Sequence, residues 1–180
     1  MATHAVSSIL RTPRANTEGS LTSVRSEPVT ANLLRVVFHL DPDAWHGSAT
    51  ERLWAEPLGN DRFRIRNSPF YAYGISLEDI VLGTEEEGQI VFRRVVIRSG
   101  HSTYRLYLRP HDLSAPSFVQ AWTPLQTLGC SFEEGLVLAV DVPPSTDIHA
   151  AYALLEAGEA AGVWAFEEGN CGHPLAASDA

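Results

Sequence analysis

Apolar and polar residues alternate through the first half of the chain, and this period of two is typical of half-buried β-strands. Clusters of Gly, Asn, Asp and Glu separate the alternating runs and mark turns between them. The predicted strands cover residues 33–40, 51–58, 62–67, 79–82 and 89–98. Several short strands joined by glycine-containing turns predict a small β-barrel-like unit, or a curled antiparallel sheet, over residues 32–100.

The pattern changes after residue 100, where segments with a helical period alternate with strand-like segments. Strands are predicted within residues 101–109, 130–144 (two short strands) and 163–170. Helices are predicted at residues 115–129 and 147–162. The order β-α-β-β-α-β is that of the ferredoxin-like split βαβ plan. We therefore predict an α+β fold whose ferredoxin-like half covers residues 101–169.

Individual residues define the expected ends and faces of the two helices. Ser114 is the predicted N-cap of the first helix, and Ser145 or Thr146 that of the second, because their hydroxyls can accept bonds from first-turn amides. Pro124 is expected to kink or restart the first helix. The second helix is predicted to turn one apolar face inward, formed by Ile148, Ala151, Tyr152 and Leu155.

The two ends of the chain lack such patterns. Residues 1–31 are rich in Ser, Thr, Arg, Ala and Pro, and they are predicted to form a disordered or loosely ordered arm. Residues 170–180 are predicted to be a flexible tail. Cys171 and His173 in this tail form half of a metal site or simply belong to a loose segment, while Cys130 is expected to be a buried thiol. No metal or other cofactor is predicted.

Composition and charge limit the classes of partner. The chain has 180 residues, 22 of them acidic against 13 basic, for a net charge of −9. This balance argues against nucleic acid and anionic membranes as partners. All the basic residues are arginines, which excludes lysine-based chemistry such as Schiff bases. No targeting segment or stretch of about 18 apolar residues is visible, so a cytoplasmic location is expected.

The segment SGHSTYR (99–105) is the main candidate site. In a strand, His101, Thr103 and Arg105 share one face, whereas Tyr104 and Leu106 face the other way. His101 is the candidate general acid or base, Thr103 a candidate ligand-binding hydroxyl and Arg105 a candidate anion clamp. The alternative is structural: Arg105 pairs with a carboxylate such as Glu133 or Glu134, and His101 caps a turn.

Other polar positions also allow a functional and a structural interpretation. Asn67 either caps the backbone at the corner before Pro69 or orients a ligand at the mouth of the barrel. Arg98 is a candidate ligand-binding residue within a basic island, which either binds an anion or keeps an exposed strand soluble. The island consists of Arg93, Arg94, Arg98, Arg105 and Arg109. Asp79 is expected to bind local backbone amides, and Glu51 and Glu56 to be solvated strand-edge residues.

Several motifs together carry a resemblance to a known family. They are ERLWAE, the string from Asn67 to Val81, SGHSTYR, AVDVPP and GVWAFEEG. In this order they resemble a bacterial family of short standalone proteins, found in actinobacteria and myxobacteria and catalogued only as a domain of unknown function. The resemblance covers residues 33–169 and implies the fold but no catalytic residue.

These observations lead to three hypotheses for function. The first is a non-catalytic binding or accessory module whose partner is an anionic small molecule or a protein. Such a module would be an accessory protein of a biosynthetic cluster or an immunity-type inhibitor. The second is a small enzyme that uses His101 as general acid or base and Arg105 as anion clamp. Nucleic-acid binding through the arginine island ranks last because of the net charge.

Overall fold

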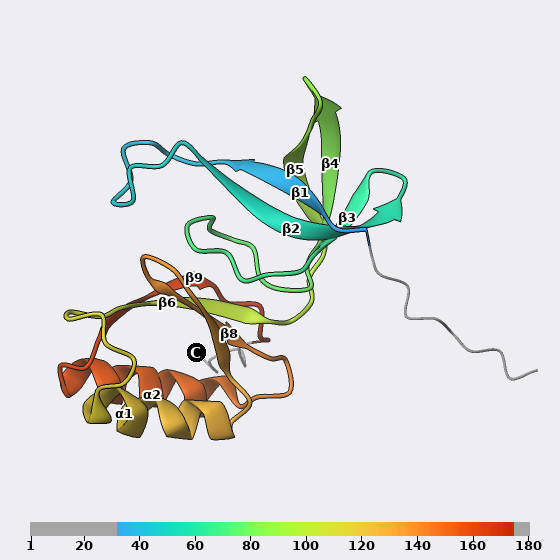
Figure 1. The fold of residues 1–180 in the computed structure, drawn as a ribbon. Coiled ribbons are helices and arrows are strands. Elements are labelled where there is room, and N and C mark those ends of the chain that lie inside the picture. The colour runs from blue at the N-terminus through green and yellow to red at the C-terminus, as the bar shows by residue number, and fades with distance from the viewer. Residues whose placement is uncertain (1–31, 175–180) are drawn as a thin grey trace, which may run out of the picture. The chain divides into compact units, whose positions relative to one another are not determined.

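The computed structural model describes residues 32–174 of the chain (Figure 1). The predicted N-terminal arm and the last six residues of the predicted tail lie outside the described residues. The described part belongs to one compact unit that contains two β-sheets and two helices. This arrangement confirms the predicted α+β class.

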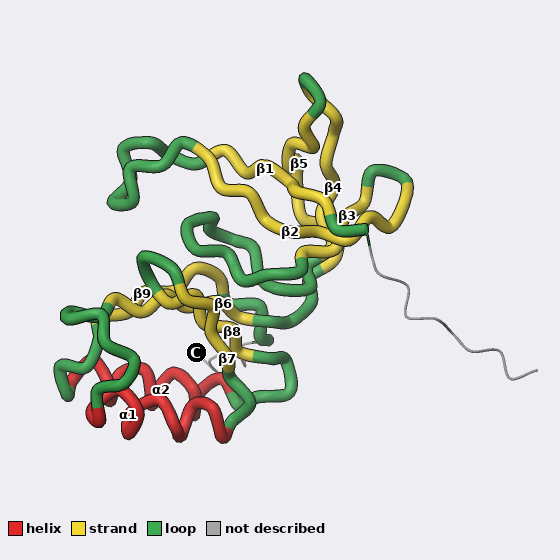
Figure 2. The backbone as a smooth tube through the Cα atoms, in the orientation of Figure 1, coloured by secondary structure: helices red, strands yellow, loops and turns green. Residues whose placement is uncertain are grey.

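The first sheet is a five-stranded barrel formed by the first part of the described chain (Figure 2). Its strands are β1 (Leu34–His39), β2 (Thr50–Gly59), β3 (Arg62–Ile65), β4 (Ile80–Glu86) and β5 (Gln89–Ile97). Neighbouring strands are antiparallel except where the barrel closes, because β5 pairs with β1 in parallel, with Val36 opposite Ile90. The curled sheet is thus as predicted, but the pair of strands that closes it is not antiparallel.

The barrel interior follows from the alternation of residues along the strands. On β2, Leu53 and Ala55 are fully buried, whereas Arg52 and Trp54 between them are exposed. Val36, Ile65 and Val81 join the first pair in one apolar cluster. Burial of this alternate set is the main driving force for closing the sheet on itself.

The second sheet has four strands and carries both helices on one face (Figure 1). Its strands are β6 (Ser102–Tyr107), β7 (Ser131–Glu134), β8 (Leu138–Val142) and β9 (Ala165–Asn170). They lie in the order β7-β8-β6-β9, and all neighbours are antiparallel. The helices are α1 (Pro116–Thr127) and α2 (Ile148–Ala160). Tyr104 and Leu106 of β6 share a core with Leu125 of α1 and Leu155 of α2.

The helices begin differently from the predictions. The N-cap of α1 is Ala115, which has no side-chain acceptor, and Ser114 bonds to Asp112 instead. Helix α1 also continues through Pro124, so the predicted restart does not occur. The N-cap of α2 is Asp147, whose carboxylate accepts bonds from the first-turn amides.

One predicted inward residue of α2 and one predicted cap have other positions. Tyr152 is 40% exposed, at the edge of the apolar face, whereas Ile148, Ala151 and Leu155 are buried as expected. The hydroxyl of Thr146 donates to the carbonyl of Leu128 rather than capping α2. Neither α1 nor α2, the helices of the described segment, has the length and apolar character needed to cross a membrane.

The prediction of a flexible tail from residue 170 onward is wrong for residues 170–174. Asn170 ends β9, and His173 is buried beyond it. The Ser102 hydroxyl lies 2.7 Å from Nδ1 of His173 and accepts a bond from the amide of Gly172. Nε2 of His173 lies 3.0 Å from the carbonyl of Pro143. The buried Ser102 hydroxyl requires such partners, and it holds this segment in place.

Candidate functional site

Strand β6 places the residues of SGHSTYR on two faces, as predicted. Tyr104 and Leu106 face the helices, whereas Thr103 and Arg105 face away from them. Thr103 is buried, and its hydroxyl donates to that of Ser76 at 2.9 Å. The face on which we expected a ligand is therefore covered by residues of the chain itself, including the segment that precedes β4.

Arg105 is enclosed by groups of the protein, which bind both of its terminal nitrogens, while its buried Nε has no hydrogen-bond partner among the described residues. Its side chain has 0% exposure, and Nη1 donates to Oε1 of Glu167 at 2.7 Å. Nη2 donates to the carbonyl of Ala72 at 2.7 Å, and the guanidinium carbon lies 4.2 Å above the ring of Tyr73. The partner is Glu167, not Glu133 or Glu134 as the structural alternative expected, because β9 pairs with β6 with Glu167 opposite Arg105. Arg105 does not face solvent as an anion clamp.

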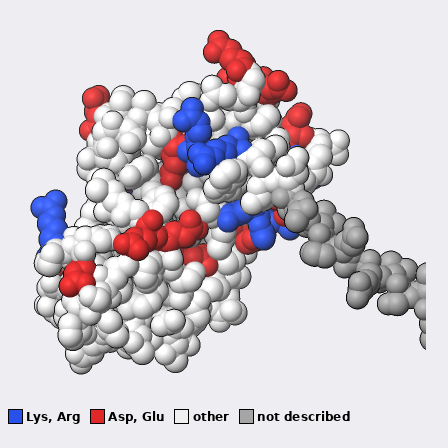
Figure 3. Space-filling view, in the orientation of Figure 1, with Lys and Arg blue, Asp and Glu red and all other residues white. Residues whose placement is uncertain are grey.

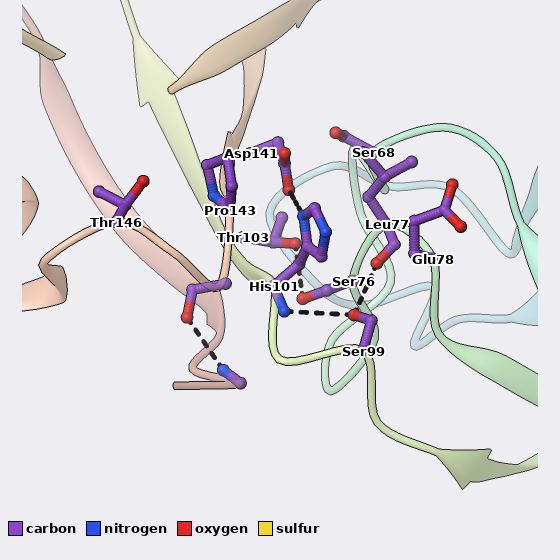
Figure 4. A network of polar contacts seen from close by, with 12 residues as sticks. Ser68, Ser76, Leu77, Glu78, Ser99, His101, Thr103, Asp141, Pro143 and Thr146 are labelled. Atoms are coloured by element: carbon purple, nitrogen blue, oxygen red, sulfur yellow. Dashed lines mark hydrogen bonds and ion pairs between the residues drawn. The ribbon is translucent and has the colours of Figure 1, made fainter. Parts of the chain in front are cut away.

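His101 forms a close pair with Asp141 of β8 (Figure 4). Nδ1 of His101 lies 2.7 Å from Oδ1 of Asp141, and the His101 side chain is 16% exposed. The hydrogen bond that His101 donates to the Asp141 carboxylate raises the pKa of His101 above its usual value, although burial opposes this effect. The arrangement holds an imidazole in one orientation, which general acid–base chemistry requires. Asp141 was not predicted, although a lone carboxylate in the apolar strand AVDVPP is a signal for it.

Asn67 takes the structural role of a backbone cap. Its Oδ1 accepts a bond from the amide of Trp54 at 2.7 Å, and its Nδ2 donates to the carbonyl of Ser68. This contact ties the corner after β3 to strand β2. A ligand-binding role of Asn67 stays a prediction.

Arg98 and Asp79 belong to one network after β5. Arg98 donates to the carbonyl of Gly74 at 2.6 Å and to Asp79 at 3.3 Å, while its side chain is 51% exposed. Asp79 is buried and accepts bonds from the amides of Ser76 and Ser99. The predicted role of Asp79 as an acceptor for local backbone amides is confirmed.

The structure overturns the prediction for Glu51. We expected a solvated strand edge, but Glu51 is buried and accepts bonds from three consecutive amides, those of Phe70, Tyr71 and Ala72, at 2.7–3.0 Å. Glu56, on the same strand, is partly exposed near Arg64, so the expectation holds for it. Glu51 differs because residues 70–72 lie against the start of β2. Its carboxylate satisfies amides that have no strand partner.

The arginine island does not form one basic surface. Arg105 is buried, and Arg93 pairs with Glu86 on the neighbouring strand. Basic and acidic side chains are interspersed on the face seen in Figure 3. Among residues 32–174, no group of three or more His, Cys, Asp or Glu residues is placed to hold a metal ion. Burial raises the pKa of the Cys130 thiol to about 11, as befits the expected buried cysteine.

A cavity of 810 Å³ lies apart from the SGHSTYR segment. Its walls come from the loop between β1 and β2, the end of β6 with the residues that follow, the β7–β8 turn and one residue of β9. The lining residues are Trp45, His46, Tyr107, Leu108, Arg109, His111, Gly135, Leu136, Val137 and Glu167. Among the residues singled out from the sequence as site candidates, Arg109 of the arginine island lines it, whereas Asn67, Arg98, His101, Thr103 and Arg105 do not. Arg105 is connected to it because Arg105 binds Glu167.

Aromatic rings form one wall of this cavity. The ring of Trp45 lies 5.0 Å from that of Tyr107 at an interplanar angle of 74°. It also lies 5.8 Å from the ring of Tyr71, beside which the ring of His46 is placed at 4.9 Å. Edge-to-face contacts of this kind are favourable and hold the rings in place. Trp45 nevertheless remains 45% exposed, so its surface is accessible to a ligand.

Glu167 and Tyr107 provide polar groups in the same cavity. Burial alone would raise the pKa of Glu167, but hydrogen bonds from Arg105 and from the hydroxyl of Tyr73 lower it. Burial and the nearby Glu167 raise the pKa of Tyr107, whose hydroxyl has no hydrogen-bond partner of good geometry among the described residues. At neutral pH the site therefore presents a carboxylate and a phenol.

The sequence contains one signal for this cavity. The segment DPDAWHG between the first two strands has the composition of a turn. A turn does not require Trp45 or His46, and aromatic residues on a loop are a common feature of binding sites. Their proximity to Glu167, more than a hundred residues later in the chain, is visible only in the folded protein.

The fold and this set of contacts define an α+β protein with a five-stranded barrel and a four-stranded, two-helix sheet. Residues 51–166 match the model of the family described as Domain of unknown function (DUF4265). Because the match covers more than half of the chain, the protein belongs to this family, and the resemblance to a domain of unknown function is confirmed. A comparison with curated proteins found no match.

A solved structure has a similar fold. It is described as a novel crystal structure of a hypothetical protein from Neisseria gonorrhoeae, with a TM-score of 0.62 and 20% sequence identity. The similarity covers 79% of this chain and 96% of that chain. At this level of identity the likeness concerns the fold alone.

Proposed function

We propose that the protein is a binding module that holds a small molecule in the cavity between Trp45 and Glu167. The cavity volume of 810 Å³ carries this proposal, because it lies within the range of about 300–1,000 Å³ that is usual for small-molecule sites. Such sites combine apolar and aromatic walls with a few fixed polar groups. The rings of Trp45 and Tyr107 and the carboxylate of Glu167 supply both features.

The fixed position of Glu167 supports the same proposal. Its carboxylate is held by the buried Arg105 and by the hydroxyl of Tyr73, so a ligand meets an already oriented acceptor. Preorganised groups favour binding because little conformational entropy is lost when the ligand arrives. This support replaces the sequence-based hypothesis that Arg105 itself contacts an anion, since Arg105 is covered by the protein.

The test is a screen of small aromatic acids, amines and neutral compounds by native mass spectrometry and thermal shift. We expect bound compounds to be lost in Trp45→Ala, which truncates one cavity wall. The matched control is Trp54→Ala, since Trp54 is similarly exposed but lies on the barrel beside Arg35. Binding that both variants retain, or no binding to the unmodified protein, would contradict the proposed cavity.

The pair of His101 and Asp141 favours a second candidate, a small enzyme with His101 as general acid or base. A histidine oriented by a carboxylate at 2.7 Å is a recurrent arrangement in acid–base catalysis. In a deletion strain with a phenotype, we expect His101→Gln to fail to restore function while the purified variant remains folded at pH 8. His149→Gln, on the exposed side of α2, is the control. Full restoration by His101→Gln would rule out this candidate.

We also propose that the helix-bearing part is a ferredoxin-like split βαβ unit. The element order from β6 to β9 and the strand order β7-β8-β6-β9 support it.

A cytoplasmic location is proposed from the composition, and fractionation of host cells would test it. The expected exclusion of nucleic acid and membranes as partners rests on the net charge of −9. The division at residue 100 into two subdomains stays a prediction, which expression of residues 101–174 alone would test.

A further inference from the structure

The cavity combines three kinds of chemistry, and each selects a part of the ligand. The first is the aromatic wall. Trp45 contacts Tyr107 edge-on at 5.0 Å and leaves much of its own surface exposed. An exposed indole held by neighbouring rings is suited to pack against another planar ring, since offset or edge-to-face aromatic contacts are favourable.

The second is the carboxylate of Glu167. Two donors, Arg105 and Tyr73, already bond to its Oε1 at 2.7 and 2.9 Å. A carboxylate has about four lone-pair positions, so acceptor capacity remains after these two bonds. The group stays ionised at neutral pH because the bonds it accepts lower its pKa. It therefore suits a ligand group that donates hydrogen bonds and carries positive charge.

The third is the cationic part of the cavity lining. Arg109 lines the cavity, and it forms no ion pair or side-chain hydrogen bond with the rest of the described chain. His111 lines it too, but its Nε2 lies 3.1 Å from Oε1 of Glu134, so this imidazole already has a partner. An accessible guanidinium is a strong and geometrically selective partner for a carboxylate. The cavity thus offers a cation at Arg109 as well as an anion at Glu167.

We propose that the cavity selects an aromatic zwitterion of the amino-acid type, with its ring against Trp45, its ammonium group on Glu167 and its carboxylate on Arg109. This inference rests on the proposed binding function and adds the class of ligand. A ligand without a carboxylate leaves Arg109 without a partner, and a ligand without an ammonium group leaves the remaining acceptor positions of Glu167, beside Arg105 and Tyr73, unused. Polar groups that are desolvated without a partner weaken binding. The zwitterion satisfies both groups.

The experiment compares three probes by isothermal titration calorimetry with the full-length protein at pH 7.5. The probes are L-phenylalanine, phenethylamine, which lacks the carboxylate, and 3-phenylpropionate, which lacks the ammonium group. We expect L-phenylalanine to bind at least about tenfold more tightly than either single-charge probe, as the loss of one charge-assisted contact implies. Equal affinities, or tighter binding of a single-charge probe, would overturn the inference.

Two variants test which residue binds each charged group of the ligand. Arg109→Gln should weaken the binding of L-phenylalanine and 3-phenylpropionate and leave the binding of phenethylamine unchanged. Glu167→Gln should weaken the binding of L-phenylalanine and phenethylamine and leave that of 3-phenylpropionate unchanged. Because Glu167→Gln also removes the partner of Arg105, its melting temperature is measured first. If this variant is unfolded, Arg109→Gln, at an exposed position, decides the question by itself.

A set of neutral aromatic probes, indole, phenol and benzamide, separates the two proposals. In one outcome the neutral probes bind, Trp45→Ala abolishes their binding, and L-phenylalanine is not preferred. This outcome would overturn the zwitterion inference and support the proposed cavity function. Absence of any binding that depends on Trp45 would overturn both. Preference for L-phenylalanine that Trp45→Ala and Arg109→Gln each reduce would support both.

Discussion

Arg105 has no contact with solvent, and its Nη1 lies 2.7 Å from Oε1 of Glu167, the residue opposite it on the neighbouring strand. The pair connects the interior of the protein to the 810 Å³ cavity, because Glu167 lines that cavity while Arg105 does not. Arg105 is thus a buried cation that positions the accessible carboxylate of Glu167, and this role requires no contact between Arg105 and a ligand. The contacts around this pair and three other sites lead to specific expectations.

Replacing Arg105 by Met should lower the free energy of unfolding by about 3 kcal/mol, because it leaves the half-buried Glu167 without its cation. Arg105→Met combined with Glu167→Leu should recover part of this loss, since two apolar groups replace a pair of charges. Urea unfolding of both single variants and the double variant measures the coupling. Additive losses would show that the two residues do not stabilise each other.

Glu51→Gln should cost about 2–3 kcal/mol of stability, because an amide replaces a charged acceptor of three backbone amides and turns one donor toward them. The matched control is Glu56→Gln on the same strand, which should change stability by about 0.5 kcal/mol or less because its pairing with Arg64, at 3.6 Å, is partly exposed to solvent. Chemical denaturation at pH 7 compares the two. Similar losses in both variants would contradict the role assigned to Glu51.

The pair of His101 and Asp141 should make stability depend on pH. The pKa of His101 is raised above 6.5 in the folded state, chiefly by its hydrogen bond with Asp141, so the folded protein holds this proton more tightly than the unfolded chain. The resulting stabilisation is fully present below about pH 6.5 and is lost as pH rises through the folded-state pKa.

The stability difference between the unmodified protein and Asp141→Asn should therefore be larger at pH 5.5 than at pH 8.5. Titration of the imidazole resonances by NMR gives a direct measurement, in which the pKa of His101 should fall in Asp141→Asn. A His101 pKa at or below the usual value in the unmodified protein would show that burial outweighs the carboxylate.

Gly158→Ala should destabilise the protein by about 2 kcal/mol, although alanine is the better helix former by about 1 kcal/mol. A Cβ at this position of α2 would overlap with Cζ2 of Trp164, whose indole is buried and donates to the carbonyl of Leu155. Thermal unfolding measures the change. The comparison variant is Ala160→Gly, at an exposed position near the end of α2, which should lose only the propensity difference. A gain in stability for Gly158→Ala would show that Trp164 can move away.

The strands and helices were largely predictable because their signals are local. Alternation along β2 and β6 identified the strands and, for β6, which residues face the helices. Asp79 was assigned correctly because a carboxylate next to a turn bonds amides within a few residues. The start of α2 was missed by one or two residues, since Ser145, Thr146 and Asp147 all have cap-forming side chains and only the folded chain selects one.

The candidate site depended on contacts between distant segments, and the sequence alone did not determine these. His101, Thr103 and Arg105 were correctly placed on one face, but the burial of Thr103 and Arg105 follows from the segment before β4 that covers these two residues. Glu167 became the partner of Arg105 because β9 adds to the sheet beside β6, an outcome of strand order rather than of spacing. The sequence by itself determined the α+β elements and their apolar faces, because those follow from local periodicity. The tertiary structure alone decided that Trp45, Arg109 and Glu167 line one cavity, because packing of the two sheets and their loops brings them together.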